Sequence, residues 1–291
     1  MESHDVIIIG AGPAGLSTAM RLRELGIKDI VVLEREAHAG GVPRHCGHFG
    51  FGWESHRHLT RGPKFAKHMV SSAAGIDIRT STTVLEFTLR NTLRVHSSKG
   101  ISDMSAKRVV LATGTRESSV AALLVGGNRL SGVMNTGTLQ KHVYLKHQKP
   151  FSNPVIIGNE WVTFSALLTC RHAGIKPAGI FAEENKLDTP WFFPLGSRFA
   201  FGVPVQTKIK LIAIHGNTNV EAVELERNGQ RSKIICDGVI LSGKFRPENA
   251  LLATAPTNII LTGNALGTMN TAGACVVQAR ALADSIVKDI K

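Results

Sequence analysis

A glycine-rich turn near the amino terminus constrains the fold more than any other feature of the sequence. The segment GAGPAG places Gly10, Gly12 and Gly15 between the apolar run DVIIIG and the helix-like run PAGLSTAMRLRELG. A second apolar run, DIVVLE, follows and ends on Glu34. This order of strand, turn, helix and strand predicts a βαβ unit that binds a dinucleotide.

Each residue of this turn has a physical role in such a unit. Gly10 permits the tight turn, Gly12 lets the backbone approach a pyrophosphate, and Gly15 lets the helix pack close to the strand. The free N–H groups and the positive dipole end of the helix then face the phosphates. Glu34 stands 19 residues after Gly15, where a carboxylate accepts hydrogen bonds from ribose hydroxyls.

A second unit of the same plan begins at NPVIIG, followed by the helix-like run TFSALLTCRHAG and the strand-like run AGIFAEE. Gly158 fits the first glycine of the fingerprint, but Glu160 and Thr163 stand at the second and third positions. A carboxylate repels a pyrophosphate, and the side chains keep the backbone at a distance. The sequence therefore predicts a second dinucleotide fold with a degenerate phosphate turn. It argues against NAD(P) binding there, and a working NAD(P)H site is the alternative.

The remaining apolar segments complete the predicted elements. Segments 205–216, 220–229 and 232–243 predict antiparallel strands, and segment 271–290 predicts a closing helix.

Charge and composition exclude several classes of protein. The chain has 291 residues, a formal charge of +12 and a pI near 9.9, which favours an acidic substrate, a nucleotide, an acidic partner or an anionic membrane surface. Its basic residues are scattered, so no nucleic-acid binding is predicted. No apolar run reaches the roughly 20 residues of a membrane helix, which leaves peripheral membrane contact open. The four cysteines form no CxxC pair, which favours a reducing, cytoplasmic location.

Two further motifs give the chain a family resemblance. VVLATG (109–114) and TNIILTGN (257–264) resemble the signatures of the two-dinucleotide-domain flavoproteins, the pyridine nucleotide-disulfide oxidoreductase-like group that includes glutathione and thioredoxin reductases. The resemblance implies an α/β fold with two Rossmann-like domains, the second inserted into the first. The FAD-binding domain would comprise residues 1–117 and 250–291, and an NAD(P)-binding-like domain residues 118–249.

The resemblance also implies which residues hold FAD. One departure is Asn264, which stands where the family has an aspartate and can bond a hydroxyl without carrying a charge. The implied cofactor-binding residues are Gly10, Gly12, Pro13, Ala14, Gly15, Glu34, Arg35, Gly41, Val84, Ala112, Thr113, Gly114, Gly263, Asn264 and Ala272.

Three longer segments resemble one branch of this family. GGVPRHCGHFGFG, SGVMNTGTLQ and FSALLTCRHAGIKPAGIFAEE look like the FAD-binding subunits of opine oxidase, hydrogen cyanide synthase and the proline or hydroxyproline dehydrogenases. Members of this branch work as hetero-oligomers with a second flavoprotein subunit. Cys46 stands alone and segment 131–140 has no cysteine, so the redox cysteine pair of disulfide reductases is missing.

The segment RHCGH supplies the only candidates for residues facing a flavin. Arg44 or His48 would neutralise negative charge or bind a carboxylate, and Cys46 is predicted to be a buried thiol. No general base is identified. Cys46 and His48, with His45 or His56, lack the usual zinc-ligand spacings, so no metal site is predicted.

The sequence as a whole predicts an FAD-dependent oxidoreductase without a redox-active disulfide. Its substrate would be a small amine, an amino acid or a related anion, and its flavin would pass electrons to a partner or acceptor. Two alternatives stay open: an NAD(P)H-dependent flavin oxidoreductase, and a non-catalytic FAD-binding subunit of a hetero-oligomer.

Overall fold

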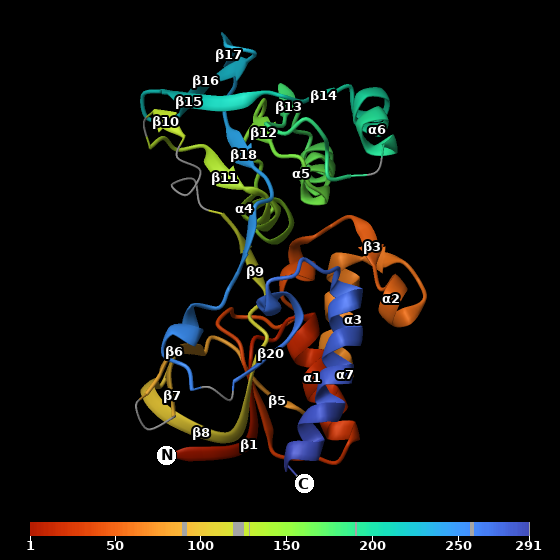
Figure 1. The fold of residues 1–291 in the computed structure, drawn as a ribbon, viewed down its shortest axis with the longest axis vertical. Coiled ribbons are helices and arrows are strands. Elements are labelled where there is room, and N and C mark those ends of the chain that lie inside the picture. Colours follow the sequence, from red (N-terminus) through yellow and green to blue (C-terminus); the bar gives the residue numbers. More distant parts are fainter. Residues whose placement is uncertain (89–91, 119–124, 128, 190, 257–258, 291) are drawn as a thin grey trace. The chain divides into compact units, whose positions relative to one another are not determined.

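The chain folds into two compact units (Figure 1). The structure, a computed structural model, describes residues 1–88, 92–118, 125–127, 129–189, 191–256 and 259–290. Unit 1 comprises Met1–Arg44, Phe49–Arg116 and Arg246–Lys291, and unit 2 comprises His45–His48 and Glu117–Phe245. The predicted α/β fold with a second unit inserted into the first is confirmed. The assignment of residues 1–117 and 250–291 to FAD, and of 118–249 to an NAD(P)-like domain, stays a prediction.

Unit 1 is built on a mainly parallel sheet. Its helices and strands are β1 (Glu2–Ile9), α1 (Pro13–Glu24), β2 (Ile30–Leu33), η1 (Val42–His45), β3 (Phe49–Phe51), α2 (Trp53–His56), β4 (Thr60–Arg61), α3 (Gly62–Ser72), β5 (Asp77–Arg79), β6 (Thr83–Phe87), β7 (Leu93–Ser97), β8 (Gly100–Leu111), β9 (Thr115–Glu117), β19 (Phe245–Pro247), η4 (Ala250–Ala253), β20 (Ile260–Leu261), η5 (Gly263–Leu266) and α7 (Ala272–Ile290). Two of these, η1 and β9, end in unit 2, and β19 begins there.

The sheet of unit 1 runs in the order β5-β2-β1-β8-β7-β6, and β20 also pairs with β8. Strand β1 lies centrally, parallel to both β2 and β8. It is apolar on both faces because both faces are covered. Val6 and Ile8 pack in the core beneath α1, α3 and α7, whereas Ile7 and Ile9 pack in a separate core with residues of β6, β7 and β8. Thr257 and Asn258 of the predicted last strand lie outside the described residues.

Unit 2 combines a parallel sheet with an antiparallel meander. Its helices and strands are β10 (Gly126–Gly127), β11 (Val133–Asn135), α4 (Thr136–Gln140), the π-helical turn η3 (Lys141–Leu145), β12 (Val155–Ile157), α5 (Trp161–His172), β13 (Gly179–Phe181), α6 (Phe192–Phe201), β14 (Val205–Gln206), β15 (Lys210–Gly216), β16 (Val220–Arg227), β17 (Gln230–Ile235) and β18 (Val239–Leu241).

The antiparallel prediction for the second half of the chain is only partly right. Strands β15, β16 and β17 do form an antiparallel meander. Within segments 205–216 and 232–243, however, β14 and β18 belong to the parallel sheet β11-β18-β12-β13-β14. Val239–Leu241 is an apolar run buried on both faces, which is typical of a parallel strand. It lacks the alternation of polar and apolar residues that would identify a half-exposed antiparallel strand.

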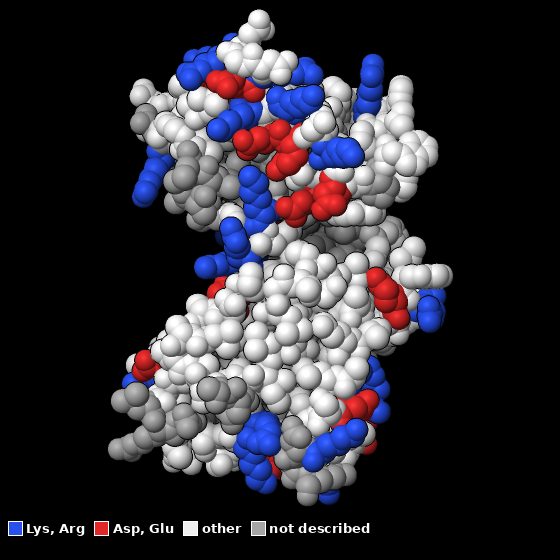
Figure 2. Space-filling model, in the orientation of Figure 1, with Lys and Arg blue, Asp and Glu red and all other residues white. Residues whose placement is uncertain are grey.

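Charged side chains are distributed over both units. Figure 2 shows Lys and Arg side chains on the visible face of each unit, as their scatter along the sequence predicts. Among the described residues, no helix combines the length and the apolar character that crossing a membrane requires.

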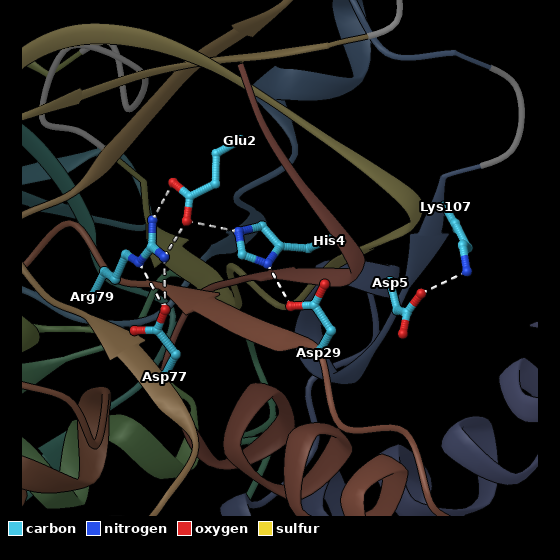
Figure 3. A network of polar contacts seen from close by, with 7 residues as sticks. All are labelled: Glu2, His4, Asp5, Asp29, Asp77, Arg79 and Lys107. Atoms are coloured by element: carbon cyan, nitrogen blue, oxygen red, sulfur yellow. Dashed lines mark hydrogen bonds and ion pairs between the residues drawn. The ribbon is translucent and has the colours of Figure 1, made fainter.

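A polar network joins strands of unit 1 (Figure 3). Arg79 of β5 donates to Glu2 of β1 at 2.5 and 2.7 Å and to Asp77 at 2.7 and 2.9 Å, while His4 contacts Asp29 at 2.6 Å. The hydrogen bond from Arg79 lowers the pKa of Glu2 to about 2. Because these carboxylates are about half exposed, each pair adds at most about 1 kcal/mol to stability.

Candidate functional site

The first candidate site lies where the parallel strands of unit 1 end together. In the register of the sheet, Ile9 is level with Leu33 of β2 and Leu111 of β8, and Leu261 of β20 is level with Leu111. The loops that follow these four strands therefore meet at one edge. Open parallel sheets bind ligands outside this carboxyl edge.

The glycines of the first turn are required by close backbone approaches. Gly10 has φ +107°, and a Cβ there would lie 2.5 Å from the carbonyl oxygen of Ala112. A Cβ on Gly15 would lie 1.9 Å from the carbonyl oxygen of Gly10. Gly12 differs, because the nearest atom to its added Cβ is Cα of Gly41 at 3.9 Å. The two tight glycines fix the turn, and Gly12 leaves bare backbone at the start of α1.

Glu34 is held in place beside this turn. Its Oε2 accepts a hydrogen bond from the backbone N–H of Ala11 at 2.9 Å, and its Oε1 accepts one from Glu36 at 2.8 Å. Each carboxylate oxygen has a second lone pair, so the group can accept further bonds from a ligand's hydroxyls. The carboxylate is almost fully buried. Glu34 therefore combines a fixed position with remaining acceptor capacity.

The loop after β20 lies against the same turn. A Cβ on Gly263, whose φ is +60°, would lie 2.7 Å from Cβ of Ala14 in the first turn of α1. The side chain of Asn264 is turned to its own loop: Nδ2 donates to the carbonyl of Asn270 at 3.1 Å, and Oδ1 accepts from the N–H of Asn270 at 2.8 Å. Both polar groups of this amide are thus used to close the loop.

The other predicted cofactor residues of unit 1 fall into three sets. Pro13 is the first residue of α1, and Thr113 donates through Oγ1 to the carbonyl of Glu248 next to the turn at Gly114. Val84, in contrast, packs in the core on the opposite face of the sheet from α1. Two further predicted residues have no contact with the turn that the described interactions identify: the exposed Arg35 and Ala272, the first residue of α7.

Unit 2 repeats this edge geometry. Ile157 of β12 is level with Leu241 of β18 and Phe181 of β13, and Asn135 of β11 is level with Leu241. Helix α4, which begins at Thr136, and the loops that begin at residues 158, 182 and 242 therefore meet at the carboxyl edge of the second sheet. A dinucleotide would be expected there by the same rule.

A carboxylate occupies part of this edge. Glu160, the residue before α5, accepts a hydrogen bond through Oε1 from the backbone N–H of Lys244 at 2.6 Å. The same oxygen would lie 2.6 Å from a Cβ on Gly243. Thr163 fills the third glycine position, and its Oγ1 is 2.8 Å from the Cβ that Gly158 lacks. The side chains of Glu160 and Thr163 therefore fill the space beside this turn.

A second carboxylate, Glu117, binds the adjoining backbone amides. It accepts hydrogen bonds from the N–H groups of Gly137 at 2.7 Å and Gly243 at 3.1 Å. Burial raises the pKa of Glu117, and these hydrogen bonds oppose that shift. The consecutive N–H groups of Gly243 and Lys244 are thus each bonded to a glutamate. Sequence reasoning missed Glu117 because its partners come from distant segments.

The segment His45–His48 packs within unit 2 although unit 1 residues flank it. Cys46 donates through Sγ to Oε1 of Gln140 at 3.3 Å, and His48 Nε2 lies 3.0 Å from Oγ of Ser165. A Cβ on Gly47 would lie 2.1 Å from the Tyr144 ring, so only glycine allows this approach. Arg44 remains in unit 1, where it bonds Glu36 at 2.9 Å. The structure therefore brings Cys46 and His48 into one unit and leaves Arg44 in the other.

The four thiols of the chain are buried, which disfavours their reactive thiolate form. Cys46, Cys170, Cys236 and Cys275 are all free and buried. Burial raises the pKa of Cys46 to about 12, and Glu117 adds to that shift. The predicted burial of the Cys46 thiol is confirmed. Within the described part of the chain, no group of three or more His, Cys, Asp or Glu side chains is arranged to hold a metal ion.

Comparison with known proteins places the chain in a family. The model of the family described as pyridine nucleotide-disulphide oxidoreductase matches residues 4–177. This match covers more than half of the chain, so the chain belongs to the pyridine nucleotide-disulphide oxidoreductase family. It is a family of FAD-binding oxidoreductases in which NAD(P) binding also occurs.

The individual proteins that resemble this chain over most of its length share little sequence identity with it. Sarcosine oxidase subunit alpha of Rhizobium meliloti (strain 1021) is 22% identical over 258 residues, which are 84% of this chain and 24% of that protein. Thioredoxin reductase of Lactococcus lactis has a TM-score of 0.81 at 15% identity, with 99% of both chains covered. L-proline dehydrogenase of P. horikoshii has a TM-score of 0.76 at 18% identity, covering 99% of this chain and 55% of that one.

These likenesses establish the fold. The chain spans only 8% and 24% of the lengths of the two curated relatives that it matches. The solved structures confirm the predicted thioredoxin reductase-like α/β fold of two units.

The residues of unit 1 fit FAD. A pyrophosphate needs bare backbone at a helix N-terminus, which Gly12 provides. An adenosine ribose needs an acceptor at the end of the second strand, which Glu34 provides with its free lone pairs. Gly263 brings the last loop against the same turn without a side chain in between. Asn264 fits less well, because its amide is engaged with Asn270.

Proposed function

We propose that the chain is an FAD-dependent oxidoreductase that oxidises a small amine, an amino acid or a related anion without using NAD(P)H. Unit 1 holds the cofactor through the Gly10–Gly15 turn and Glu34, and unit 2 has kept the dinucleotide fold without its phosphate site. Bound FAD would supply the hydride acceptor that no amino-acid side chain provides.

The hydrogen bond between Glu160 and Lys244 is the observation that carries the proposal. A phosphate arriving at the start of α5 meets a carboxylate where a glycine would leave space. Two unit charges about 4 Å apart repel by roughly 1 kcal/mol in water and about 4 kcal/mol near a protein surface. The carboxylate also occupies the backbone donor of Lys244. Both effects weaken pyrophosphate binding in unit 2.

The state of the cysteines supports the same conclusion. Disulfide reduction needs a pair of thiols, one of them ionised near neutral pH. The four thiols here are buried, and the pKa of each is raised by burial. Electrons therefore enter from an organic substrate in this proposal and leave to an acceptor or a partner protein.

Two relatives suggest the substrate class. One is a subunit of sarcosine oxidase and another is an L-proline dehydrogenase, and both names denote oxidation of a secondary amino acid. A net charge of +12 favours the approach of an anionic substrate. Either Arg44 or His48 remains a candidate for contact with its carboxylate. Because that relative is named as one subunit of an enzyme, a second flavoprotein subunit is part of the proposal. A cytoplasmic location, which the unpaired cysteines favour, is also part of it.

Anaerobic titration of the purified protein tests the proposal. The visible flavin band is followed during additions of NADH, then NADPH, and in separate samples sarcosine and L-proline. We expect little reduction by either nicotinamide, and reduction by an amino acid with the chain alone or with its co-purifying partner. Prompt bleaching by NADH or NADPH would show that unit 2 still admits a nicotinamide. Failure to load FAD at all would refute the whole proposal.

A pair of variants links the outcome to Glu160. Glu160→Gly removes the carboxylate, and we expect tighter NADH binding, on the order of tenfold, from the lost repulsion. Glu221→Gln removes an equal charge from an exposed position of unit 2 and should leave NADH binding unchanged. Equal NADH affinity in both variants would mean that Glu160 does not control this site.

A further inference from the structure

The helix α6 (Phe192–Phe201) is fixed to unit 2 by one of its faces. The ring of Phe193 lies 4.6 Å from those of Trp161 and Phe164 of α5, centroid to centroid. Ser197 is buried on the same side and donates its hydroxyl to the carbonyl of Val203. This inner face accounts for the packing of the helix, so the fold does not require an apolar outer face.

The outer face is nevertheless strongly apolar. Trp191 is 78% exposed, Phe199 76%, Phe192 52% and Leu195 45%. Their spacing of i, i+1, i+4 and i+8 gathers them into one stripe about 100° wide on a helix of 3.6 residues per turn. Single exposed apolar side chains are ordinary, but a contiguous stripe rich in aromatic rings marks an interaction surface.

The charges along this segment favour an anionic partner. Arg198 borders the stripe, and its guanidinium lies 5.8 Å from the centroid of the Phe199 ring. No Asp or Glu occurs between Thr189 and Val220, where Lys208 and Lys210 lie, although Glu183, Glu184 and Asp188 precede this stretch. In Figure 2 the surface over α6 is mostly uncharged, and both basic and acidic side chains lie near it.

We propose that α6 binds the surface of an anionic phospholipid bilayer. Trp191, Leu195 and Phe199 would lie at the level of the lipid headgroups, and Arg198 would lie beside lipid phosphates. Aromatic and leucine side chains on one helix face with basic neighbours are what such interfacial helices require. A protein partner that contacts α6 alone is less well matched, since one ten-residue helix is about 15 Å long and offers far less than the roughly 800 Å² per partner of a stable interface. This inference goes beyond the redox proposal and does not depend on it.

Vesicle sedimentation of the full chain tests the inference. Vesicles of phosphatidylcholine containing phosphatidylglycerol are compared with vesicles of phosphatidylcholine alone. We expect binding to the anionic vesicles, a blue shift of the tryptophan emission that the Trp191→Phe variant loses, and weaker binding at high salt. The double variant Trp191→Ser/Phe199→Ser should bind at least about tenfold more weakly, because it removes most of the exposed apolar area.

Matched variants separate this surface from other exposed groups. Ile235→Ser changes a side chain that is 71% exposed on β17 of the same unit, and its vesicle binding should equal that of the parent. Arg198→Gln should weaken binding to the anionic vesicles and leave the melting temperature unchanged. Absence of vesicle binding by the parent, or equal binding by the double variant, overturns the inference. So does a parent dimer that the double variant converts to monomer without vesicle binding, because a second copy would then cover α6.

Discussion

Asn264 illustrates how one side chain can take a role that its position alone does not reveal. The motif TNIILTGN suggests that Asn264 replaces an aspartate and bonds a cofactor hydroxyl, a role that stays a prediction. In the structure, the amide pairs with both backbone groups of Asn270. An amide can donate and accept at once, whereas an ionised carboxylate can only accept. Asparagine therefore suits this loop in a way that aspartate does not.

The variant Asn264→Asp should consequently be less stable than the parent at neutral pH. The new carboxylate loses the bond to the Asn270 carbonyl and lies against that oxygen, which costs about 1–3 kcal/mol of the free energy of unfolding. The carbonyl raises the folded-state pKa of the new group, so the deficit appears as pH rises above about 4 and shrinks below it. Thermal unfolding at about pH 4 and pH 7.5 measures the effect.

A second asparagine supplies the control for this prediction. Asn228 is exposed in the turn between β16 and β17 with φ +51°, a conformation that aspartate also adopts. Asn228→Asp should leave stability nearly unchanged at both pH values. If Asn264→Asp were as stable as the parent at pH 7.5 and held FAD more tightly, the loop-closing role of the amide would be wrong.

At the scale of elements, the first strand, turn and helix should behave as one unit. Gly15→Ala places a methyl group within the van der Waals radius of the Gly10 carbonyl oxygen, so α1 must move away from β1. We expect a loss of about 3 kcal/mol or more in stability, together with loss of FAD loading. Denaturant unfolding and the visible spectrum measure the two effects.

Gly196→Ala is the matched substitution within a helix. No atom lies within 4 Å of the Cβ that would be added at Gly196, in the interior of α6. Alanine favours the helix over glycine by about 0.5–1 kcal/mol, so this variant should be slightly more stable and keep its FAD. Equal destabilisation by both substitutions would show that the lack of space around Gly15 is not the cause of the stability loss in Gly15→Ala.

The sequence predicts elements well where the chemistry is local. The Gly10–Gly15 turn, α1 and β2 follow each other directly, so spacing alone reveals them. The parallel pairing of β18 with β11 and β12 depends on segments about 85–105 residues away in the sequence, and a short apolar run does not specify its partner. The bond from Lys244 to Glu160 was hidden for the same reason.

At the scale of the whole molecule, buried thiols in both units make the stability of the fold sensitive to alkaline pH. Cys275 belongs to unit 1, and Cys46, Cys170 and Cys236 belong to unit 2. Burial raises the pKa of Cys46 and of Cys170 to about 12. The folded chain thus keeps these protons at pH values where the unfolded chain releases them. Stability should therefore fall as pH rises above about 9, by up to about 1.4 kcal/mol per pH unit for each thiol.

Two measurements check this prediction. A thiol reagent at about pH 8 should react slowly with the folded protein. After unfolding, it should react readily with all four cysteines. In urea unfolding, the double variant Cys46→Ala/Cys170→Ala should lose less stability between about pH 8 and pH 10 than the parent does. Fast labelling of one thiol in the folded state would contradict the low reactivity that burial implies.

The placement of His45–His48 has a consequence for exchanging parts between related proteins. The chain passes between the units four times, because residues 45–48 belong to unit 2 and the residues on both sides to unit 1. A chimera that imports another protein's equivalent of Glu117–Phe245 would remove two contacts. Cys46 would lose its bond to Gln140, and Gly47 would no longer face the ring of Tyr144. The two units are therefore not independent modules. A transferable second unit must carry these four residues with it.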